Sequence, residues 1–574
     1  MTDRDTGVDR RLFCNLCASL GVAGTVLPDI LWAADMADGI TTDQLAAAEA
    51  LAGLQFTDEE RRLMLDGVNQ LRGSYGTLRE VGLDNAVPPA LSFDPGLGGP
   101  VTRRSAPPAS SRSIARPSSR PDDGEIPFLP AATLGALVRY GHISSVELAE
   151  LYLDRLRRLD PRLECVVTLT EERAMAQARR ADEELARGVW RGPLHGVPWG
   201  AKDLLAVKGY PTTWGAAPFK DQVIDTDATV VRRLDEAGAV LVAKLTLGAL
   251  AWGDVWFGGT TKNPWNLEQG SSGSSAGPGS ATAAGLVGFS IGSETWGSIV
   301  SPSTRCGVSG LRPTFGRVSR AGAMALSWSM DKLGPMCRTV PDCAAVFDAI
   351  RGADPLDRTV VDRPFGWDDS MTIDGLRIGY VRSAFEAEPE GEDEEELLFA
   401  RQSRGHELTA LEVLRSMGID LIPIELPELP VSALSFILSA EAAAAFDELT
   451  RSGRDEELVR QIEDAWPNEF RTARTIPAVE YIQANRVRTL VMREMARIMD
   501  DVDVYVCPSF GGDNLLLTNL TGHPAVVVPN GFTDKGSPTS ITFTGRLYGE
   551  AETLAVANAY QQATGFHLEH PPLG

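Results

Sequence analysis

The stretch GSSGSSAGPGSATAAGLVGFSIGSETWGS, residues 270–298, is the most informative part of this 574-residue sequence. It contains two loops of small residues, 270–280 and 292–298, separated by an Ala-rich segment and the apolar run 286–291. Gly and Ser at this density are typical of a flexible linker. Here the first loop continues directly into sequence that favours a helix and then a strand, so both loops can meet at one end of a sheet. Small residues there let backbone amides approach a substrate oxygen, as an oxyanion hole requires.

The segments around this stretch alternate between helical and strand patterns. Amphipathic helices are predicted at 145–159 and 171–188, and an acidic run at 386–396 is interpreted as the start of a helix that ends near Gly418. Short continuous apolar runs, the pattern of strands buried on both faces, occur at 239–243, 376–381, 502–507 and 525–528. This alternation predicts an α/β sandwich. Residues 432–500 are helix-rich and are expected to form a cap over the site.

The N-terminal part of the chain is predicted to lie outside this domain. Residues 1–34 resemble a twin-arginine export signal, because Arg10-Arg11 precedes the apolar run Leu12–Leu27. The alternative interpretation is a helix packed on the protein, so both an exported (periplasmic) and a cytoplasmic location stay open. Residues 35–93 read as helical, and 94–130 as a Pro/Ser/Arg-rich flexible linker. The main domain is then expected to span 131–574.

Composition excludes several classes of function. The formal net charge is −24 and the pI about 4.8, which argues against nucleic acid as a partner. The seven cysteines form no disulfide framework, and Cys14 and Cys17 are a lone C-x-x-C pair with no second pair at zinc-finger spacing. The six histidines show no metal-ligand spacing, and no run is long enough to cross a membrane. We therefore expect no metal, no cofactor and no membrane span.

A lysine is the best candidate base for a serine nucleophile, because no histidine lies near either Gly/Ser loop. Lys202 follows Gly196-Val197-Pro198-Trp199-Gly200-Ala201, an apolar segment punctuated by Gly and Pro. Burial disfavours the ammonium form of lysine, and a neutral lysine can accept a proton relayed from a serine. Each of these residues taken alone is more often structural than catalytic.

Taken together, these motifs resemble the amidase signature family of serine hydrolases from about residue 130 to the C-terminus. The resemblance rests on many short matches that occur in the same order: 192–198 (GPLHGVP), Lys202-Asp203, 263–266 (NPWN), the Gly/Ser loop, 297–299 (GSI), 306–314 (CGVSGLRPT), 334–340 (GPMCRTV) and 519–525 (NLTGHPA). It implies a central mixed β-sheet sandwiched by helices, here with an N-terminal helical extension.

The resemblance also implies roles for single residues. Lys202 matches the family's catalytic lysine, Ser274 its bridging serine on a cis peptide, and Ser298 its nucleophile. The backbone N–H groups of Thr295, Trp296, Gly297 and Ser298 match the oxyanion hole. Trp296 and Ser275 are expected to contact substrate, whereas His195 is interpreted as structural.

Four positions depart from the family pattern. Trp296 stands where glycine is usual, Glu294 replaces Asp, Val300 replaces a frequent Arg, and Ala276 replaces Gly. None removes a member of the Lys–Ser–Ser set, so hydrolysis stays the expectation. An indole beside the oxyanion hole is expected to reshape the acyl pocket.

The leading hypothesis is an amidase that hydrolyses the C–N bond of a small hydrophobic or aromatic amide through an acyl-enzyme. Eight of the eleven tryptophans fall between residues 190 and 328, and some are expected to line the substrate pocket. A carbamate or ester hydrolase fits the same machinery. The catalytic subunit of a tRNA-dependent amidotransferase ranks lower, because of the acidic charge and the export-like segment, and a catalytically silent binding protein is the rival class. The oligomeric state stays open, a homodimer included.

Overall fold

The structure, a computed structural model, describes residues 39–81, 116–368 and 370–573. The chain divides into two units, residues 1–73 and 74–574, and each is described by itself. The predicted export signal at 1–34, the Cys14/Cys17 pair and residues 94–115 of the predicted linker lie outside the described residues. In the rest of that linker, residues 116–130, the short 3₁₀ helix η2 (Ile126–Phe128) buries Ile126 and Pro127.

The described part of the first unit is helical. Helix α3 (Thr42–Ala52) starts with a capping box in which Thr41 and Gln44 exchange side-chain and backbone hydrogen bonds. Helix α4 (Asp58–Glu80) follows, and its last seven residues, 74–80, belong to the second unit. A small apolar cluster of Leu45, Met64 and Val68 joins the two helices. This agrees with the helical pattern expected from residue 40 onward.

The second unit is built on a mixed sheet, which confirms the predicted α/β fold class. In spatial order its eleven described strands are β1 (Val166–Leu169), β3 (Val240–Leu245), β2 (Pro198–Lys202), β8 (Phe289–Glu294), β10 (Lys332–Cys337), β9 (Ser309–Arg312), β14 (Ala525–Phe532), β15 (Pro538–Gly545), β13 (Val504–Pro508), β11 (Ile378–Val381) and β12 (Ile422–Ile424). Two hairpins stand apart from it: β4 (Val255–Trp256) with β5 (Gly259–Thr260), and β6 (Lys262–Asn263) with β7 (Asn266–Gly270).

Helices surround this sheet. They are α5 (Ala131–Arg139), α6 (Ser145–Leu163), α7 (Glu171–Ala186), α8 (Thr229–Glu236), α9 (Ala276–Ala283), α10 (Val300–Cys306), α11 (Val340–Ile350), α12 (Arg382–Glu386), α13 (Glu394–Ser416), α14 (Phe436–Ala445), α15 (Asp447–Arg451), α16 (Trp466–Ala473), α17 (Ala478–Asp501), α18 (Asn514–Thr521) and α19 (Glu550–Thr564). The second unit also contains short 3₁₀ helices in the segments between or after these elements: η3 (Ala217–Phe219), η4 (Ala249–Ala251), η5 (Ser432–Leu434), η6 (Arg454–Glu457) and η7 (Phe566–Leu568).

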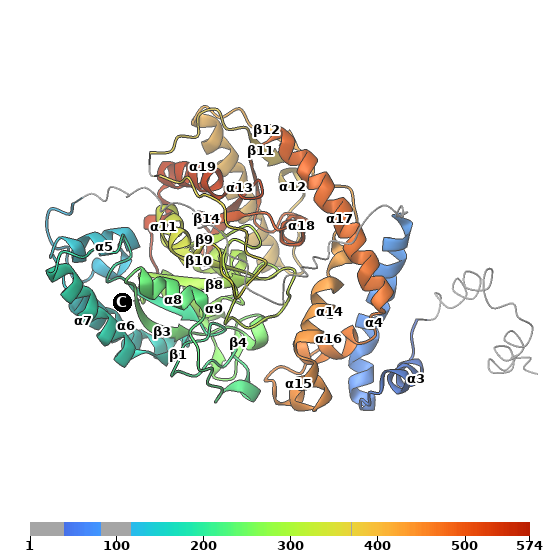
Figure 1. Ribbon diagram of the computed structural model, residues 1–574. Helices are drawn as coiled ribbons and strands as arrows, with labels where there is room; N and C mark the ends of the chain where they lie inside the picture. The colour runs from blue at the N-terminus through green and yellow to red at the C-terminus, as the bar shows by residue number, and fades with distance from the viewer. Residues whose placement is uncertain (1–38, 82–115, 369, 574) are drawn as a thin grey trace, which may run out of the picture. The chain divides into compact units, whose positions relative to one another are not determined.

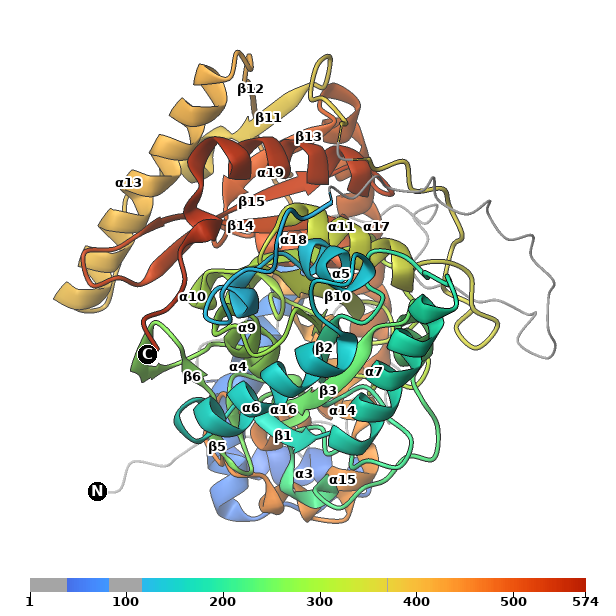
Figure 2. The ribbon, with the colours of Figure 1, turned by 90° about the vertical axis from the view of Figure 1, so that its left-hand side faces the viewer.

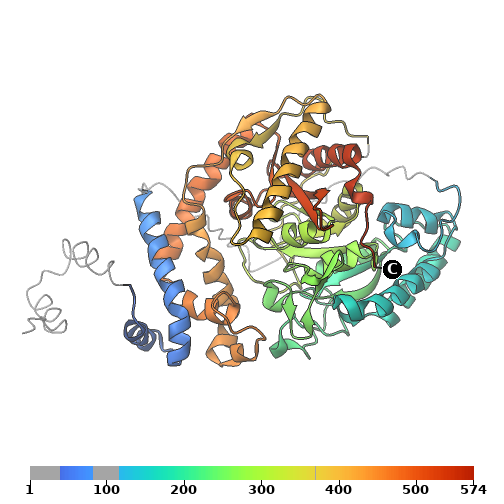
Figure 3. The same ribbon diagram turned by 180° about the vertical axis from the view of Figure 1, so that it is seen from behind.

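Different helices serve different parts of the second unit. Figure 2 shows α13 and α19 against the part of the sheet formed by β13, β14 and β15, and both helices contact β14 and β15. The helix-rich segment 432–500, with α14 to α17, lies at the other end of the unit from α5 to α7 in Figures 1 and 3. Among the helices of the described residues, none has the length and apolar character that a membrane crossing needs.

Strand β3 illustrates why the continuous apolar runs become central strands. Leu241 packs in a cluster with Trp199 and Phe289, whereas Val240 and Val242 pack in a second cluster with residues of α6 and α7. Successive side chains of a strand point to opposite faces, so an unbroken apolar run fits a strand covered on both sides. The run at 286–291 differs from its prediction, because the strand starts only at Phe289, after a turn at Gly285.

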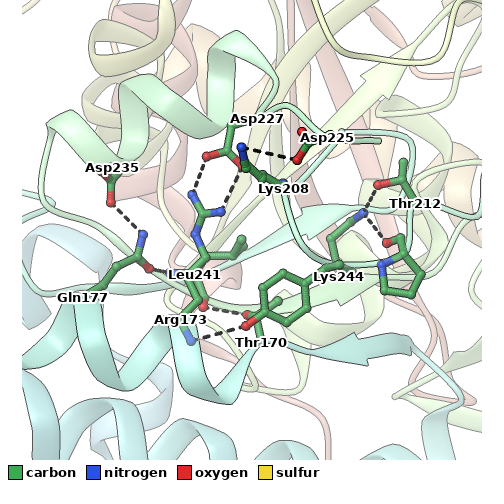
Figure 4. Close-up of polar contacts among 12 residues, drawn as sticks. Thr170, Arg173, Gln177, Lys208, Thr212, Asp225, Asp227, Asp235, Leu241 and Lys244 are labelled. Carbon is green, nitrogen blue, oxygen red and sulfur yellow. Dashed lines mark hydrogen bonds and ion pairs between the residues drawn. The ribbon is translucent and has the colours of Figure 1, made fainter. Parts of the chain in front are cut away.

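Buried polar contacts fix β3 against its neighbours (Figure 4). The amide of Leu241 donates to Gln177 Oε1 at 2.9 Å, and the Thr170 hydroxyl donates to the Leu241 carbonyl at 2.7 Å. Gln177 Nε2 in turn donates to Asp235 of α8 at 2.7 Å. Lys244, on the same strand, donates to Thr212 Oγ1 at 2.8 Å. Outside the view of the figure, Lys244 also pairs with buried Asp203 at 2.6 Å. These contacts tie β3 to α7 and to the segment that follows β2.

The topology brings the two sequence stretches of interest to one edge of the sheet. Strands β2 and β8 run parallel and pair directly, with Trp199 opposite Phe289. Strand β2 ends at Lys202, and β8 ends at Glu294. Residues 292–294 of the predicted second loop therefore belong to the strand, and only 295–298 form the loop. The carboxyl ends of parallel strands therefore place Lys202 beside residues 293–298. In open α/β sheets such ends are the usual position of a ligand site.

Candidate active site

Lys202 lies at the centre of a cluster of serines. Its side chain is fully buried at the end of β2. Its Nζ is 2.9 Å from Ser274 Oγ, 3.0 Å from Ser275 Oγ and 2.9 Å from Ser293 Oγ. Ser274 and Ser275 come from the first Gly/Ser loop, and Ser293 from the end of β8. Three hydroxyls thus surround one amine.

The hydrogen bonds of these serines distinguish their roles. Ser275 Oγ donates to the Ser293 carbonyl at 3.0 Å and accepts from the Ser293 amide at 3.1 Å, so its own proton is already used. A neutral lysine amine has one lone pair, so it can accept one hydrogen bond, and it needs a hydroxyl whose proton is free to donate. Ser274 and Ser293 remain as donors, and of the three serines Ser274 alone lines the cavity described below. Ser274 is therefore the hydroxyl able to connect Lys202 to a bound molecule.

The environment favours a neutral Lys202. Burial lowers the pKa of Lys202 well below that of a free lysine, and the carboxylates of Asp331 and Glu294 oppose this only in part. Because the neutral amine is the proton acceptor, its fraction rises as pH increases through this lowered pKa. A usable base is then present at lower pH than an exposed lysine would allow.

The first Gly/Ser loop needs its glycine. The Gly273–Ser274 peptide bond is cis, and a Cβ on Gly273 would lie 1.8 Å from the Gly253 carbonyl oxygen. Two hydrogen bonds hold the loop from other segments. The Ser272 amide donates to Asp254 at 3.0 Å, and the hydroxyls of Ser272 and Ser301 are 2.7 Å apart. The Gly/Ser run is therefore a fixed part of the site and not a linker.

The second loop, residues 295–298, presents unpaired backbone amides. No described residue accepts a hydrogen bond from the amides of Thr295, Trp296, Gly297 or Ser298. Gly297 has φ = +83°, a conformation that glycine adopts without strain. The Ser298 carbonyl accepts from the Ser275 amide at 3.1 Å, which ties the two loops together. The Ser298 hydroxyl makes no hydrogen bond with a described residue and is half-buried at the cavity.

Glu294 anchors the segment that follows Ser298. Its Oε2 accepts from the amides of Ile299 and Val300 at 2.8 and 3.0 Å, at the start of α10. Its Oε1 accepts from Arg312 at 2.6 Å and from Asn519 at 2.8 Å. Burial opposes ionisation of this carboxyl, but Arg312 and the amide donors outweigh it and lower the pKa of Glu294 to about 2. The carboxylate therefore stays charged and holds the helix start in place.

A cavity of about 580 Å³ opens onto both loops. This volume suits a small organic molecule. Its described lining comes from the two loops and α10, from η4 and the residues after it, from the loop before β10, from the helix-rich segment and from the residues after β13: Ala251, Trp252, Gly253, Gly273, Ser274, Thr295, Trp296, Gly297, Ser298, Ser301, Leu326, Ser435, Leu438, Ser439, Asp464, Trp466, Glu469, Phe510 and Leu515.

The structure brings most of the candidate residues together and moves one away. Ser274, Thr295, Trp296, Gly297 and Ser298 line the cavity, and Lys202 lies directly behind Ser274. Ser275, expected to contact substrate, is instead fully buried, does not line the cavity and holds Lys202. The reason is the turn between the cis peptide and α9, which points Ser275 into the protein toward β8.

Two buried residues near the site have no counterpart among the candidates. Ser293 is the third hydroxyl on Lys202; it lies within the predicted second loop, 292–298, but no motif distinguishes it there from the other small residues. Asp331 accepts from Thr295 Oγ1 at 2.6 Å and from the amides of Leu326 and Ser327. No local motif marks Asp331, which reaches the site from a loop before β10. His195, interpreted as structural, is fully buried and bonds to the Ala181 carbonyl.

Fold and site together define a class: α/β proteins with a buried lysine and two loop serines, and no histidine among the described residues that line the cavity. A sequence profile described as Amidase matches residues 147–515, and the chain belongs to this family, the amidase signature enzymes. The resemblance expected from the sequence motifs is thereby confirmed.

Similar proteins extend this finding. The A subunit of glutamyl-tRNA(Gln) amidotransferase from Roseiflexus sp. (strain RS-1) is 35% identical over 486 residues, which cover 76% of this chain and 96% of the relative. Peptide amidase from Stenotrophomonas maltophilia matches the structure with a TM-score of 0.67 and 28% identity, over 78% of this chain and 99% of that one. A chain from a vestigial protein complex, described in connection with the origins of an s-triazine catabolic enzyme, has a TM-score of 0.69 and 28% identity over 76% and 99%.

The substitution Asp331→Asn is expected to shift the pH dependence of activity. The Asp331 charge raises the pKa of Lys202, so its removal lowers that pKa and moves the acid limb of kcat/KM to lower pH. Asparagine can keep its carbonyl oxygen toward the amides of Leu326 and Ser327 and turn its NH2 toward Thr295 Oγ1, so the loop should stay in place and kcat at the pH optimum should change by less than about threefold.

A pH–rate profile measures both effects. Asp342→Asn is the matched control, because Asp342 is a buried carboxylate that accepts from the amides of Ala131 and Ala132 at the start of α5. The acid limb of kcat/KM in Asp342→Asn should lie at the same pH as in the unmodified protein. An acid limb that does not move in Asp331→Asn, or moves to higher pH, contradicts the argument.

Activity is expected to survive chelation. No group of three or more His, Cys, Asp or Glu side chains arranged to hold a metal occurs within residues 39–81, 116–368 and 370–573. Prolonged dialysis against EDTA and 1,10-phenanthroline should leave kcat within about twofold of the untreated enzyme, since the proposed base is an amine. A loss that zinc or another divalent ion restores would show that a metal takes part.

Proposed function

We propose that this chain hydrolyses the C–N bond of a carboxamide through an acyl-enzyme on Ser298. The observation that carries the proposal is the 2.9 Å contact between buried Lys202 Nζ and Ser274 Oγ, beside a cavity that Ser298 also lines. This supplies a nucleophile, a relay hydroxyl and a base of lowered pKa in one place. The coarser statement, an enzyme of the amidase family acting on C–N bonds, follows from the family itself.

The proposed reaction has two halves. In the first, Ser298 Oγ attacks the amide carbon while its proton passes through Ser274 to Lys202. The negative oxygen of the tetrahedral intermediate accepts hydrogen bonds from the free amides of the 295–298 loop. The C–N bond then breaks, and the leaving amine takes the proton back from Lys202 through Ser274. In the second half, water attacks the acyl-enzyme by the same relay and releases the acid.

The named relatives support one setting for this chemistry, the catalytic subunit of a tRNA-dependent amidotransferase. The amidotransferase subunit from Roseiflexus matches over nearly its whole length, at 35% identity. This favours the amidotransferase setting over the free-standing small-amide amidase that the sequence motifs alone favoured. In this setting the chain binds partner subunits in addition to its small-molecule substrate.

The cavity supports a second candidate, a free-standing amidase for a hydrophobic amide. Trp252, Trp296, Trp466 and Phe510 all line the cavity, and such walls suit apolar or aromatic groups. The likeness to peptide amidase supports the same setting. The two settings share the reaction and differ in substrate and partners.

Ammonia release separates the two settings. The purified full-length chain is assayed with glutamine and with benzamide, alone and after addition of the other subunits of a bacterial glutamyl-tRNA(Gln) amidotransferase. The amidotransferase setting predicts glutamine turnover that rises with the added subunits. The free-standing setting predicts benzamide turnover that does not respond to them. No ammonia from either substrate, with Ser298 also unreactive toward a fluorophosphonate, would reject the proposed hydrolysis.

The substitution Trp296→Gly is expected to change the ranking of substrates. The Trp296 side chain is 45% exposed at the cavity, whereas its role in the oxyanion loop depends only on its backbone amide. Removing the indole enlarges the acyl pocket and removes an aromatic face, so bulky acyl amides should gain relative to small ones. Glycine also adds backbone freedom, so a moderate loss of kcat is expected on every substrate. Values of kcat/KM for bulky and small acyl amides test this; a uniform drop with the ranking unchanged means that Trp296 only supports the loop.

A further inference from the structure

The charged groups of the cavity are all of one sign. Among the described residues that line it, Asp464 and Glu469 carry carboxylates, and none is Lys, Arg or His. The rest of the lining is glycine, hydroxyl, aliphatic and aromatic. A bound molecule therefore meets negative charge and aromatic faces, without a fixed cation to balance a negative charge of its own.

The position of Glu469 is well defined. It lies in the first turn of α16, and this helix is tied to the cavity wall because Trp466 Nε1 donates to the Leu250 carbonyl at 2.9 Å. The Glu469 carboxylate accepts one hydrogen bond, from Ser439 Oγ at 3.3 Å, and forms no ion pair with a described residue. Asp464, two residues before the helix, is exposed and also lacks an ion pair within the described residues.

Three arginines of this region do not line the cavity, and two of them pair with carboxylates. Arg471 of α16 forms a buried ion pair with Asp455 at 2.6 Å, and Arg474 pairs with Asp447. Arg460 places its guanidinium over the Trp252 ring, 4.5 Å from the ring centroid, and does not line the cavity. The negative charge of Asp464 and Glu469 is thus left open to the cavity.

Physical chemistry then sets a preference for the bound molecule. An anionic group in this cavity would lose water and gain no cation, whereas an ammonium group would gain a carboxylate partner and aromatic faces. Burial already raises the pKa of Glu469, which shows that its negative charge is poorly solvated. A cation beside it would relieve that penalty.

We propose that this cavity selects carboxamides whose acyl part ends in a positively charged ammonium group and disfavours those that end in a carboxylate. Glu469 is the main specificity-determining residue, with Asp464 as the second. The inference rests on the proposed hydrolysis and adds a substrate class to it. It applies in either setting, and for glutamine it means that the α-carboxylate is the disfavoured part.

Three primary amides of nearly equal length test the preference: 5-aminopentanamide ends in ammonium, hexanamide in methyl and adipamic acid in carboxylate. Their leaving group is ammonia, so the acyl part alone fills the cavity. We expect kcat/KM to fall in that order, by about five- to tenfold at each step, the size of a partly exposed ion pair. Wild-type full-length enzyme is used at fixed ionic strength.

Variants assign the effect to the cavity. Glu469→Gln should reduce the advantage of 5-aminopentanamide over hexanamide about fivefold, and Asp464→Asn by less, because Asp464 is exposed. Glu463→Gln is the matched control: it makes the same change of charge at an exposed neighbour that does not line the cavity. An unchanged order in Glu463→Gln excludes a general effect of the acidic chain.

A second measurement needs no turnover. Labelling of Ser298 by a small fluorophosphonate is followed in the presence of pentylammonium, pentanol or pentanoate, and pentylammonium should protect best. Equal rates for the three amides, or a preference for the carboxylate, would overturn the inference while hydrolysis stands. Equal protection by the three additives would do the same. Failure of both hydrolysis and labelling would instead overturn the proposed function.

Discussion

Replacement of Ser298 by alanine is expected to lower kcat/KM by about 10⁴-fold or more, with the fold intact. The reason is that Ser298 Oγ forms the bond to the carbonyl carbon of the substrate. Ser298 is also the serine that both lines the cavity and belongs to the 295–298 loop, whose backbone amides are free. The Ser298 side chain is half-buried and makes no hydrogen bond with a described residue, so its loss should change stability by less than about 0.5 kcal/mol.

Ser303→Ala is the matched control for this experiment. Ser303 lies in α10, a few residues after Ser298, and its buried hydroxyl has no hydrogen-bond partner among the described residues. Its removal should leave activity within about twofold of wild type. Thermal unfolding of both variants verifies that they fold. Near-normal turnover by Ser298→Ala would mean that another group is the nucleophile.

The second large effect is expected for Lys202→Met, which should lower kcat by about 10³–10⁴-fold. Methionine fills a similar volume but cannot accept a proton, so Ser274 loses the base that the relay requires. The double variant Lys202→Met/Ser298→Ala should be no slower than the slower single variant, because parts of one unit cannot be removed twice. Fully additive losses would contradict a shared pathway.

Lys332→Met controls for the removal of a buried lysine. Lys332 also lies on a strand of the sheet, and burial likewise lowers its pKa well below that of a free lysine. Its Nζ donates to the Met330 carbonyl and reaches none of the three serines around Lys202. Its removal should leave kcat within about tenfold of wild type. A loss as large as that of Lys202→Met would mean that buried charge in general, and not a base at Lys202, matters.

The bounds of the strands are where the sequence predictions and the structure differ most. The apolar run at 239–243 predicts β3 well, because both faces of that strand are covered and the pattern has no alternative. The run at 286–291 is displaced by three residues, because Gly285 turns the chain there and the polar residues Ser290 and Ser293 belong to the strand. Apolarity marks burial, and it does not mark where a strand ends.

The site shows the same division. Lys202, Ser274 and Ser298 could be proposed from the sequence because each lies in or close to a recognisable motif: 192–198, the Gly/Ser loop and 297–299. Asp331 contacts Thr295 without lining the cavity, and no local motif marks it. Glu469 lines the cavity from the segment 432–500 that was expected to cap the site, but no pattern singles it out within that segment. Ser275 was misplaced because its neighbour Ser274 faces the cavity, and a change of one position in a turn reverses the direction of a side chain.

Net charge and sequence similarity favour different biological settings. The formal charge of −24 argues against a tRNA partner and so places an amidotransferase role low. An amidotransferase from Roseiflexus nevertheless supplies a relative at 35% identity. Net charge describes the long-range field of a chain, and it says little about one cavity or one partner surface. The charges that line the cavity are the more specific evidence on the substrate.

The most direct test of the central claim is to locate the covalent adduct of a small fluorophosphonate by peptide mass spectrometry. The protein is labelled at neutral pH, digested and mapped, with Lys202→Met labelled in parallel. We expect one adduct, on Ser298, and a much slower reaction in Lys202→Met. An adduct on Ser274 or on a serine outside the cavity, or equal labelling rates in the two proteins, would contradict it.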